Sequence, residues 1–327
     1  MTTTTKSDVL VIGAGVSGLS TALSLIESGL DVTIRAADLP QRTTSVAAGA
    51  IWGAHLVGVD ERVRMWSALT LDRLRELAAD PATGIRETRG LVASLTDSSG
   101  PPQFTEGAGT LSRCDPAALP AGYAAGWQYS APVVAMPVYL DYLTDEFLRG
   151  GGELHVAGRL DSLAQAADAA SARVIVNCSG IGARQLVPDP ELIPVRGQAV
   201  VMANPGLTEF FVGETDQPDE ITYFFPHGAT VVLGGTQQPD SASTEPDPAA
   251  AERIVRDCAA VEPRLASAPI LAHRVGLRPV RPRVRLEVQA IDGGRHIVHN
   301  YGHGGAGVTL SWGCARAAAD DVLRLLS

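Results

Sequence analysis

The feature that most constrains this chain is a glycine-rich turn between a buried strand and a helix near its start. Residues 8–12 (DVLVI) form a short β-branched apolar run, typical of a parallel strand buried on both faces. The motif GAGVSG (13–18) follows at once, and then come apolar residues at helical spacing. Gly29 is placed to end this helix in a left-handed cap, and a second strand is expected over 31–35.

Each glycine of this turn has a physical reason. Gly13 permits the tight turn, Gly15 lets the backbone approach a pyrophosphate, and Gly18 lets the helix pack closely on the strand. The start of the helix presents unpaired N–H groups and a positive dipole end to phosphates. In this strand–turn–helix–strand setting, the motif predicts a dinucleotide site rather than a merely structural turn. Asp38, which comes slightly late after the second strand, is either the acidic residue that holds the adenosine ribose or a loop aspartate.

Length and composition bound the remaining possibilities. The 327 residues are too many for one small core and suit two associated domains. A net charge of −10 argues against nucleic acid or an anionic membrane as a partner. No apolar run approaches the length of a membrane span and the first residues hold no signal core, so we expect a cytoplasmic protein. The cysteines Cys114, Cys178, Cys258 and Cys314 lack metal-ligand spacing, which predicts buried thiols and no metal site.

Four later segments decide between nicotinamide and flavin. They are TTSVAAGAIW (43–52), VIVNCSGIGA (174–183), GLRPVRPRVRLE (276–287) and HNYGHGGAGVTLSWGC (299–314). On these segments the sequence resembles the D-amino acid oxidase family nearly from end to end, and the last two are highly specific in combination. Only the stretch of about 55–130 matches loosely. The resemblance implies FAD as the cofactor.

The resemblance also implies an α/β fold with two interleaved parts. One part is a doubly wound, Rossmann-like FAD-binding domain, which we expect to comprise residues 1–52, 140–195 and 273–327. The other is an α+β substrate-binding domain formed by 53–139 and 196–272. Alternating apolar runs in the second part predict a largely antiparallel sheet.

The cofactor contacts that the resemblance implies are spread over the chain. Hydroxyl groups at 43–44 could donate to phosphate oxygens, and the small residues at 47–49 let backbone lie against a flat ring. The glycine run at 302–307 leads into a helix whose N-terminus, with Thr309, would stabilise the negative charge of a reduced flavin. A reduced nicotinamide is neutral and needs no such site. The residues expected to contact FAD are Gly13, Ala14, Gly15, Val16, Ser17, Gly18, Asp38, Thr43, Thr44, Ala48, Gly49, Ile51, Leu160, Ser179, Gly180, Arg278, Gly304, Gly305, Gly307, Val308 and Thr309.

Three residues are expected to hold the substrate. Arg278 matches the family's carboxylate-binding arginine, and a guanidinium can grip a carboxylate through two parallel hydrogen bonds. From composition alone, Arg278 does not stand out from the nearby arginines, which would usually be solvated surface charges. Tyr223 matches a tyrosine that helps bind the carboxylate, although it could be an ordinary strand residue. Gly305 would accept a hydrogen bond from the amino group through its carbonyl. His303 resembles a catalytic base, but the family match makes it structural.

These implications define the expected activity. It is oxidative deamination of neutral D-amino acids to 2-oxo acids, ammonia and hydrogen peroxide, by hydride transfer from the α-carbon to flavin N5. Oxygen is the electron acceptor, no side chain is needed as a catalytic acid or base, and a homodimer is one expected assembly.

Three alternatives stay open. An oxidase for D-aspartate would need a second cation, whereas the segment before Tyr223 carries Glu214, Asp216, Asp219 and Glu220 and no Arg or Lys. A glycine or sarcosine oxidase would show no stereochemical preference. A non-catalytic flavin-binding protein would be yellow, but no amino acid would reduce it.

Overall fold

One mixed sheet organises the molecule. The computed structural model describes residues 7–97, 100–163, 166, 172–217, 220–291 and 294–327. Within these residues the strands form a single sheet of 14 strands, whose main path runs β4-β5-β3-β9-β10-β11-β8-β13-β14-β7-β1-β2-β6. No helix of the described residues is both long and apolar enough to cross a bilayer. The expected α/β class is confirmed, with a parallel half and a mostly antiparallel half.

The parallel half contains the predicted dinucleotide turn. Its strands are β1 (Val9–Ile12), β2 (Val32–Ala36), β6 (Glu153–Val156), β7 (Val174–Asn177) and β14 (Arg295–His303). Neighbouring pairs along the order β14-β7-β1-β2-β6 are all parallel. Its helices are α1 (Val16–Glu27), α3 (Met136–Arg149), α5 (Ala183–Leu186) and α7 (Gly307–Leu326). Strand β1 is completely buried, as its apolar run predicts.

The end of α1 agrees with the sequence. Gly29 has φ of 81° and donates to Ile26 O, while the N–H of Leu30 reaches Leu25 O. These two bonds close the helix in a Schellman cap, which requires a left-handed residue. The following strand β2 begins and ends one residue later than predicted.

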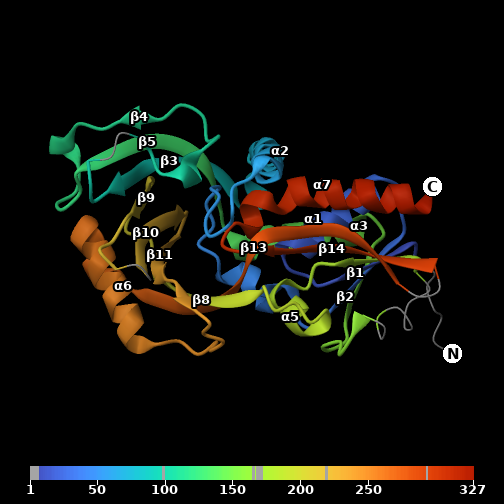
Figure 1. Ribbon diagram of the computed structural model, residues 1–327. Helices are drawn as coiled ribbons and strands as arrows, with labels where there is room; N and C mark the ends of the chain where they lie inside the picture. Colours follow the sequence, from blue (N-terminus) through green and yellow to red (C-terminus); the bar gives the residue numbers. More distant parts are fainter. Residues whose placement is uncertain (1–6, 98–99, 164–165, 167–171, 218–219, 292–293) are drawn as a thin grey trace.

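The other half of the sheet is largely antiparallel. Its strands are β3 (Ile85–Ser94), β4 (Ser112–Arg113), β5 (Ala125–Val134), β8 (Ile193–Ala203), β9 (Phe210–Gly213), β10 (Glu220–His227), β11 (Thr230–Thr236), β12 (Gln238–Pro239) and β13 (Ile270–Ile291). Helix α6 (Pro248–Val261) packs on this half, and β3 with β9 forms its parallel pair. Helix α2 (Glu61–Leu77) packs instead beside α7 (Figure 1).

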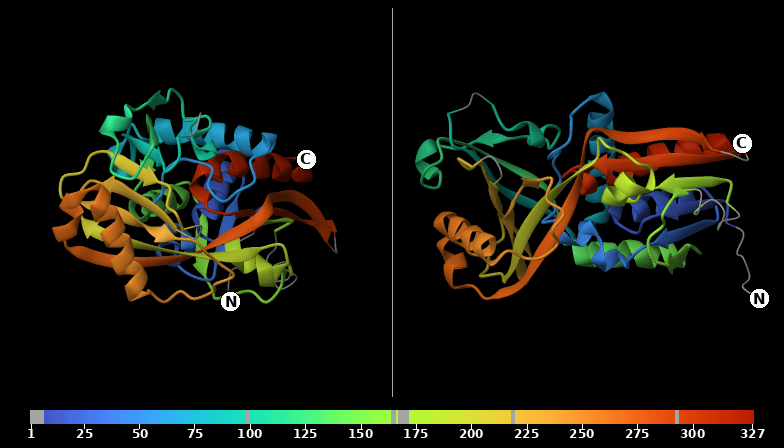
Figure 2. Two further views of the ribbon diagram at one scale, coloured as in Figure 1. Left: turned by 60° about the vertical axis from the view of Figure 1, so that its left-hand side comes forward. Right: turned by 60° about the horizontal axis from the view of Figure 1, so that its bottom comes forward.

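Strand β13 joins the two halves. It is 22 residues long and pairs with β8 near its start and with β14 near its end, so it passes from one half into the other (Figure 2). Its middle, around Arg278, therefore lies where the two halves meet. The division of the chain into two domains at the boundaries given above stays a prediction.

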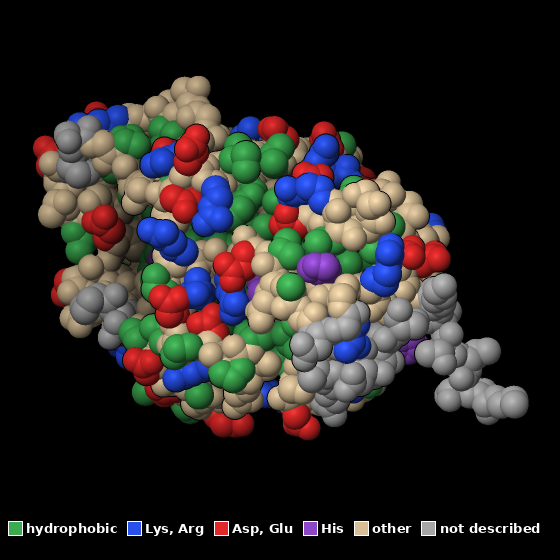
Figure 3. Space-filling view, turned by 45° about the vertical axis from the view of Figure 1, so that its right-hand side comes forward, with side chains coloured by type: hydrophobic (Ala, Val, Ile, Leu, Met, Phe, Trp, Pro, Cys, Tyr) green, Lys and Arg blue, Asp and Glu red, His purple; other side chains and the backbone are tan. Residues whose placement is uncertain are grey.

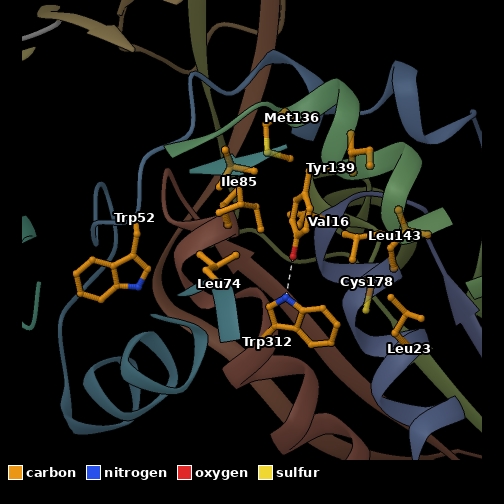
Figure 4. Close-up of a cluster of buried hydrophobic side chains, with 14 of the residues drawn as sticks. Val16, Leu23, Trp52, Leu74, Ile85, Met136, Tyr139, Leu143, Cys178 and Trp312 are labelled. Atoms are coloured by element: carbon orange, nitrogen blue, oxygen red, sulfur yellow. Dashed lines mark hydrogen bonds between the residues drawn. The ribbon is translucent and has the colours of Figure 1, made fainter. Parts of the chain in front are cut away.

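The largest core cluster lies between the sheet and helices α1, α2, α3 and α7. Tyr139 is fully buried, and its hydroxyl accepts a hydrogen bond of 2.7 Å from the indole nitrogen of Trp312 (Figure 4). Buried aromatic side chains combine a large apolar area with a polar atom that needs a partner, so this bond fixes α3 against α7. On the face shown in Figure 3, acidic and basic side chains are interspersed, and the net charge is not gathered into one patch there.

Three short 3₁₀ segments border the junction of the two halves. They are η2 (Thr44–Ala47), η4 (Gln103–Thr105) and η6 (Gly180–Gly182). Others lie at Pro40–Arg42, Pro81–Thr83, Pro116–Ala118 and Pro263–Ser267.

Candidate active site

A long cavity of about 1020 Å³ runs through the junction of the two halves. It is lined by the β1–α1 turn, the segment 42–55, the carboxyl end of β7, parts of β8, β10 and β13, and the start of α7. In a doubly wound sheet, ligands bind at the carboxyl ends of the parallel strands, which is where one end of this cavity lies. Its volume is at the upper end of the range for small-molecule sites, as a dinucleotide would require.

The predicted cofactor residues converge on this cavity with one exception. All of them line it except Gly18. A Cβ atom on Gly18 would overlap the carbonyl oxygen of Gly13, so Gly18 is needed for helix packing and does not itself face the cavity. Leu160 lines the cavity from a loop, four residues beyond the end of β6.

The turn between β1 and α1 has the geometry that its spacing predicts. Gly13 has φ of 106°, and a Cβ atom there would lie 2.5 Å from the carbonyl oxygen of Cys178. At the start of α1, the N–H of Val16 donates to Oγ of Ser45 at 3.0 Å. Ser45 lines the cavity and was missed by the sequence analysis, although it directly follows the two threonines that were chosen.

Three threonine hydroxyls that were expected to face FAD donate their hydrogen bonds to backbone carbonyls of the protein instead. Thr43 donates to Pro40 O at 2.7 Å, and Thr44 donates to Leu277 O at 3.3 Å. Thr309 donates to Gly53 O at 2.9 Å and accepts from Gly53 N at 3.0 Å. The hydroxyl of Thr309 therefore ties α7 to the segment before α2. Toward the cavity, α7 presents its N-terminus, which is the positive end of the helix dipole.

The sequence analysis also did not predict a group of arginines that lines the cavity at the parallel half of the sheet. Arg35, Arg42, Arg159 and Arg184 line the cavity together with the exposed Asp38. The Nε atom of Arg35 is buried, and no described residue pairs with it. Arg35 is the penultimate residue of strand β2, close to where the motif predicts an acidic residue. A buried donor without a partner needs one from a ligand or water, and a phosphate oxygen would supply it. The glycine turn, Ser45 and Arg35 thus fit FAD.

Arg278 is a cation without an acidic partner among the described residues. It lines the cavity from β13, and its Nη1 donates to Thr236 O at 3.0 Å. Removal from bulk water lowers the pKa of its guanidinium, an effect that Tyr223 partly opposes. Gly197 on β8 leaves room for it, because a Cβ atom there would overlap the guanidinium.

The neighbouring arginines behave differently. Arg281 binds Asp189 at 3.0 Å and also Glu191. Arg285 binds Glu287 at 2.7 Å, and Arg283 is exposed. Of the four arginines at 278–285, only Arg278 lines the cavity.

Tyr223 and Gly305 line the same cavity as Arg278. The Tyr223 ring is buried in β10 and stacks on Phe225 with centroids 4.6 Å apart. Burial raises the pKa of its hydroxyl, while the charge of Arg278 lowers it. Gly305 is exposed in the turn before α7. The three residues expected to hold the substrate thus line one cavity, from β10, β13 and the turn before α7.

His303 is buried and its Nε2 lies 3.0 Å from Oδ1 of Asn300. Asn300 in turn donates to Thr21 at 3.0 Å. Burial lowers the pKa of His303 to about 4, so its ring is neutral near pH 7. A neutral ring fixed in a buried hydrogen-bond chain favours the structural role over that of a base.

Neither the cysteines nor the possible metal ligands among the described residues form a second site. All four cysteines are free; Cys178, Cys258 and Cys314 are buried, whereas Cys114 is only partly buried, contrary to expectation. In the part of the chain that the structure describes, no three His, Cys, Asp or Glu side chains are grouped so as to hold a metal ion.

Comparison with known proteins agrees with this geometry. The family model described as "FAD dependent oxidoreductase" matches residues 8–321. A D-amino-acid oxidase of Rubrobacter xylanophilus is 47% identical over 310 residues, covering 95% of this chain and 94% of that protein. A D-amino-acid oxidase of Streptomyces coelicolor is 43% identical over 314 residues, covering 95% of each.

A solved structure supports the same fold. The glycine oxidase of Geobacillus kaustophilus superposes with a TM-score of 0.80 at 18% identity, covering 98% of this chain and 95% of that one. The match of the family model to nearly the whole chain, with two relatives above 40% identity, places this protein in the FAD-dependent oxidoreductase family of the D-amino acid oxidase type.

Proposed function

We propose that this protein is an FAD-dependent oxidase of neutral D-amino acids that uses oxygen and releases a 2-oxo acid, ammonia and hydrogen peroxide. The observation that carries the proposal is Arg278, a cation without an acidic partner among the described residues, in a cavity whose other end is a dinucleotide turn. The relatives named D-amino-acid oxidase support it over 95% of the chain.

The protein's own residues bind and orient the substrate. FAD, when bound, supplies the acceptor for the hydride that leaves the α-carbon. Arg278 binds the substrate carboxylate, and the Tyr223 hydroxyl donates a further hydrogen bond to it. The carbonyl of Gly305 accepts a hydrogen bond from the amino group. Contacts from three directions fix the α-carbon and distinguish its two faces, which is the basis of D-selectivity.

The site needs no side chain to remove a proton from carbon. His303 is neutral and hydrogen-bonded to Asn300, which suits a structural part. Catalysis then rests on positioning and on exclusion of water by apolar walls.

The cavity wall favours substrates with an uncharged side chain. Among the lining residues are Ile51, Phe104, Val212, Ile221 and Phe225, all apolar. Of the other arginines that line the cavity, Arg35 lies on β2 and Arg184 on α5, both in the parallel half. An acidic side chain would thus enter an apolar wall without a counter-ion, which is costly.

Of the acidic residues before Tyr223, Glu214, Asp216 and Glu220 do not line the cavity. Glu214 accepts from the hydroxyl of Ser94 at 2.6 Å, and Glu220 pairs with Arg253 at 2.6 Å. Asp219 lies outside the described residues. The likeness to glycine oxidase concerns the fold, and an apolar wall would be unused by glycine. The homodimer and the cytoplasmic location stay predictions.

A substrate panel tests the proposal. Peroxide formation is measured with D-methionine, D-aspartate, glycine and L-methionine at equal concentrations. We expect kcat/KM to be highest for D-methionine, with no turnover of the L-form. Higher activity on D-aspartate or glycine would overturn the assignment to neutral D-amino acids, and a yellow protein without any turnover would favour the non-catalytic alternative.

A further inference from the structure

The segment between Ala50 and Leu56 is held in an unusual backbone conformation. Both residues lie in the left-handed region, with φ of 59° and 50°. Such a conformation costs a non-glycine residue about 1–3 kcal/mol and persists only where surrounding contacts impose it. Backbone strain of this kind gathers at ligand sites, which makes the side chains between these two residues candidates for ligand contacts.

Contacts on both sides impose this conformation. The indole nitrogen of Trp52 donates to Ser67 O at 3.0 Å, and Gly53 exchanges two hydrogen bonds with Thr309. The carbonyl oxygen of Leu56 packs so closely on Gly304 that a Cβ atom there would overlap it. The segment is therefore fixed to the start of α7 and to α2 before any ligand binds.

This arrangement places His55 between the two proposed anchors of the substrate. His55 lines the cavity, and its ring carbon Cδ2 lies 2.9 Å from where a Cβ atom of Gly305 would be. Arg278 is the charged group that acts on the ring, and the side chain of Gln237 is its polar neighbour. Burial, and then the charge of Arg278, lower the pKa of His55 to about 4, while Gln237 raises it.

The chemistry of a neutral imidazole limits what His55 can bind. A neutral ring has one N–H and one nitrogen with a lone pair, and that second nitrogen can only accept a hydrogen bond. The accepting nitrogen does not suit the carboxylate that Arg278 would hold. It suits a group with N–H bonds.

We propose that His55 accepts a hydrogen bond from the amino group of the D-amino acid and so positions the α-carbon together with Gly305. This inference rests on the proposed function and assigns a positioning residue within that site. It explains why a strained segment holds a polar ring beside Arg278 and Gly305.

Two ligands that differ in the amino group test it. D-methionine has the amine, whereas benzoate is a carboxylate that lacks it. The dissociation constant of D-methionine is taken from the concentration dependence of anaerobic flavin reduction, and that of benzoate from the change in flavin absorbance. Both are measured for the wild type and for His55→Phe, which keeps a ring but has no acceptor.

Loss of the acceptor should weaken D-methionine binding by about 10- to 100-fold, as for a hydrogen bond to a charged or strongly polar group. Benzoate binding should stay close to that of the wild type. His55→Leu is a second acceptor-free variant with the same expected split, so the result does not depend on one variant folding. His55→Asn, which restores an acceptor, should recover part of the loss.

Each other outcome overturns the inference. Unchanged D-methionine binding in the acceptor-free variants would show that His55 does not contact the amine. Equal losses for D-methionine and benzoate would indicate packing or a carboxylate contact. If the wild-type flavin were not reduced by any D-amino acid, the proposed function itself would fail and this inference with it.

Discussion

Replacing Arg278 with methionine should separate binding from stability. The substitution keeps a flexible, unbranched side chain and removes the guanidinium and its charge from the cavity. If the guanidinium grips the substrate carboxylate through two charge-assisted hydrogen bonds, their loss costs about 3–6 kcal/mol. At 1.36 kcal/mol for each factor of ten, kcat/KM should fall by about 100- to 10,000-fold.

The free energy of unfolding of the same variant should not fall with its activity. No described acidic residue pairs with Arg278, and removal from bulk water already lowers the pKa of its guanidinium. Replacing a desolvated charge with an apolar side chain is often neutral or stabilising. The free energy of unfolding should therefore stay unchanged or rise, despite the lost bond to Thr236 O.

Arg281→Met is the matched control. This residue lies three positions along the same strand but does not line the cavity, and its guanidinium pairs with the buried Asp189. It should keep kcat/KM and lose about 1–3 kcal/mol of stability. Steady-state kinetics and urea unfolding of both variants, saturated with FAD, measure the two effects. Near-wild-type kinetics for Arg278→Met, or a marked loss of its stability, would refute the anchor assignment.

Three further predictions follow from local geometry. Gly197→Ala should displace the Arg278 guanidinium and lower kcat/KM at least tenfold with FAD retained; unchanged kinetics would refute the contact. Arg35→Met should weaken FAD binding about tenfold in a fluorescence titration, because the variant lacks the buried Nε–H that would donate a hydrogen bond to FAD. Equal affinity would contradict this. His303 has its pKa lowered from 6.5 to about 4, and His299 likewise. The unfolded chain then binds more protons below pH 6.5, so stability should fall between pH 6.5 and 4, by up to about 1.4 kcal/mol per pH unit for each buried ring. A melting temperature that is constant over this range would exclude this linkage.

Local patterns predicted the parallel half of the sheet well. The glycine spacing and the flanking apolar runs placed β1, α1 and β2 to within one residue at most of their bounds, except that α1 begins inside the motif at Val16. These elements are set by short-range rules for turns, caps and buried strands. The left-handed cap at Gly29 is one such rule, and it holds.

The site itself depended on contacts that no local pattern reveals. The hydroxyl of Thr309 was expected to face the cofactor, but it is bound to Gly53, which is 256 residues away in sequence. Likewise, Arg278 was singled out by family resemblance, whereas the physical difference from Arg281 is the acidic partner that only the fold supplies. Arg35 departs from the pattern, because the dinucleotide motif predicts an acidic residue near the end of β2 and gives no signal for a basic one.

The most direct test of the central claim is to mix the FAD-bound protein with D-methionine or L-methionine in the absence of oxygen. The visible absorbance of the oxidised flavin reports whether the amino acid delivers its hydride. We predict rapid bleaching by the D-form and none by the L-form. Bleaching by both forms, or by neither, would contradict the proposed D-amino acid oxidase activity.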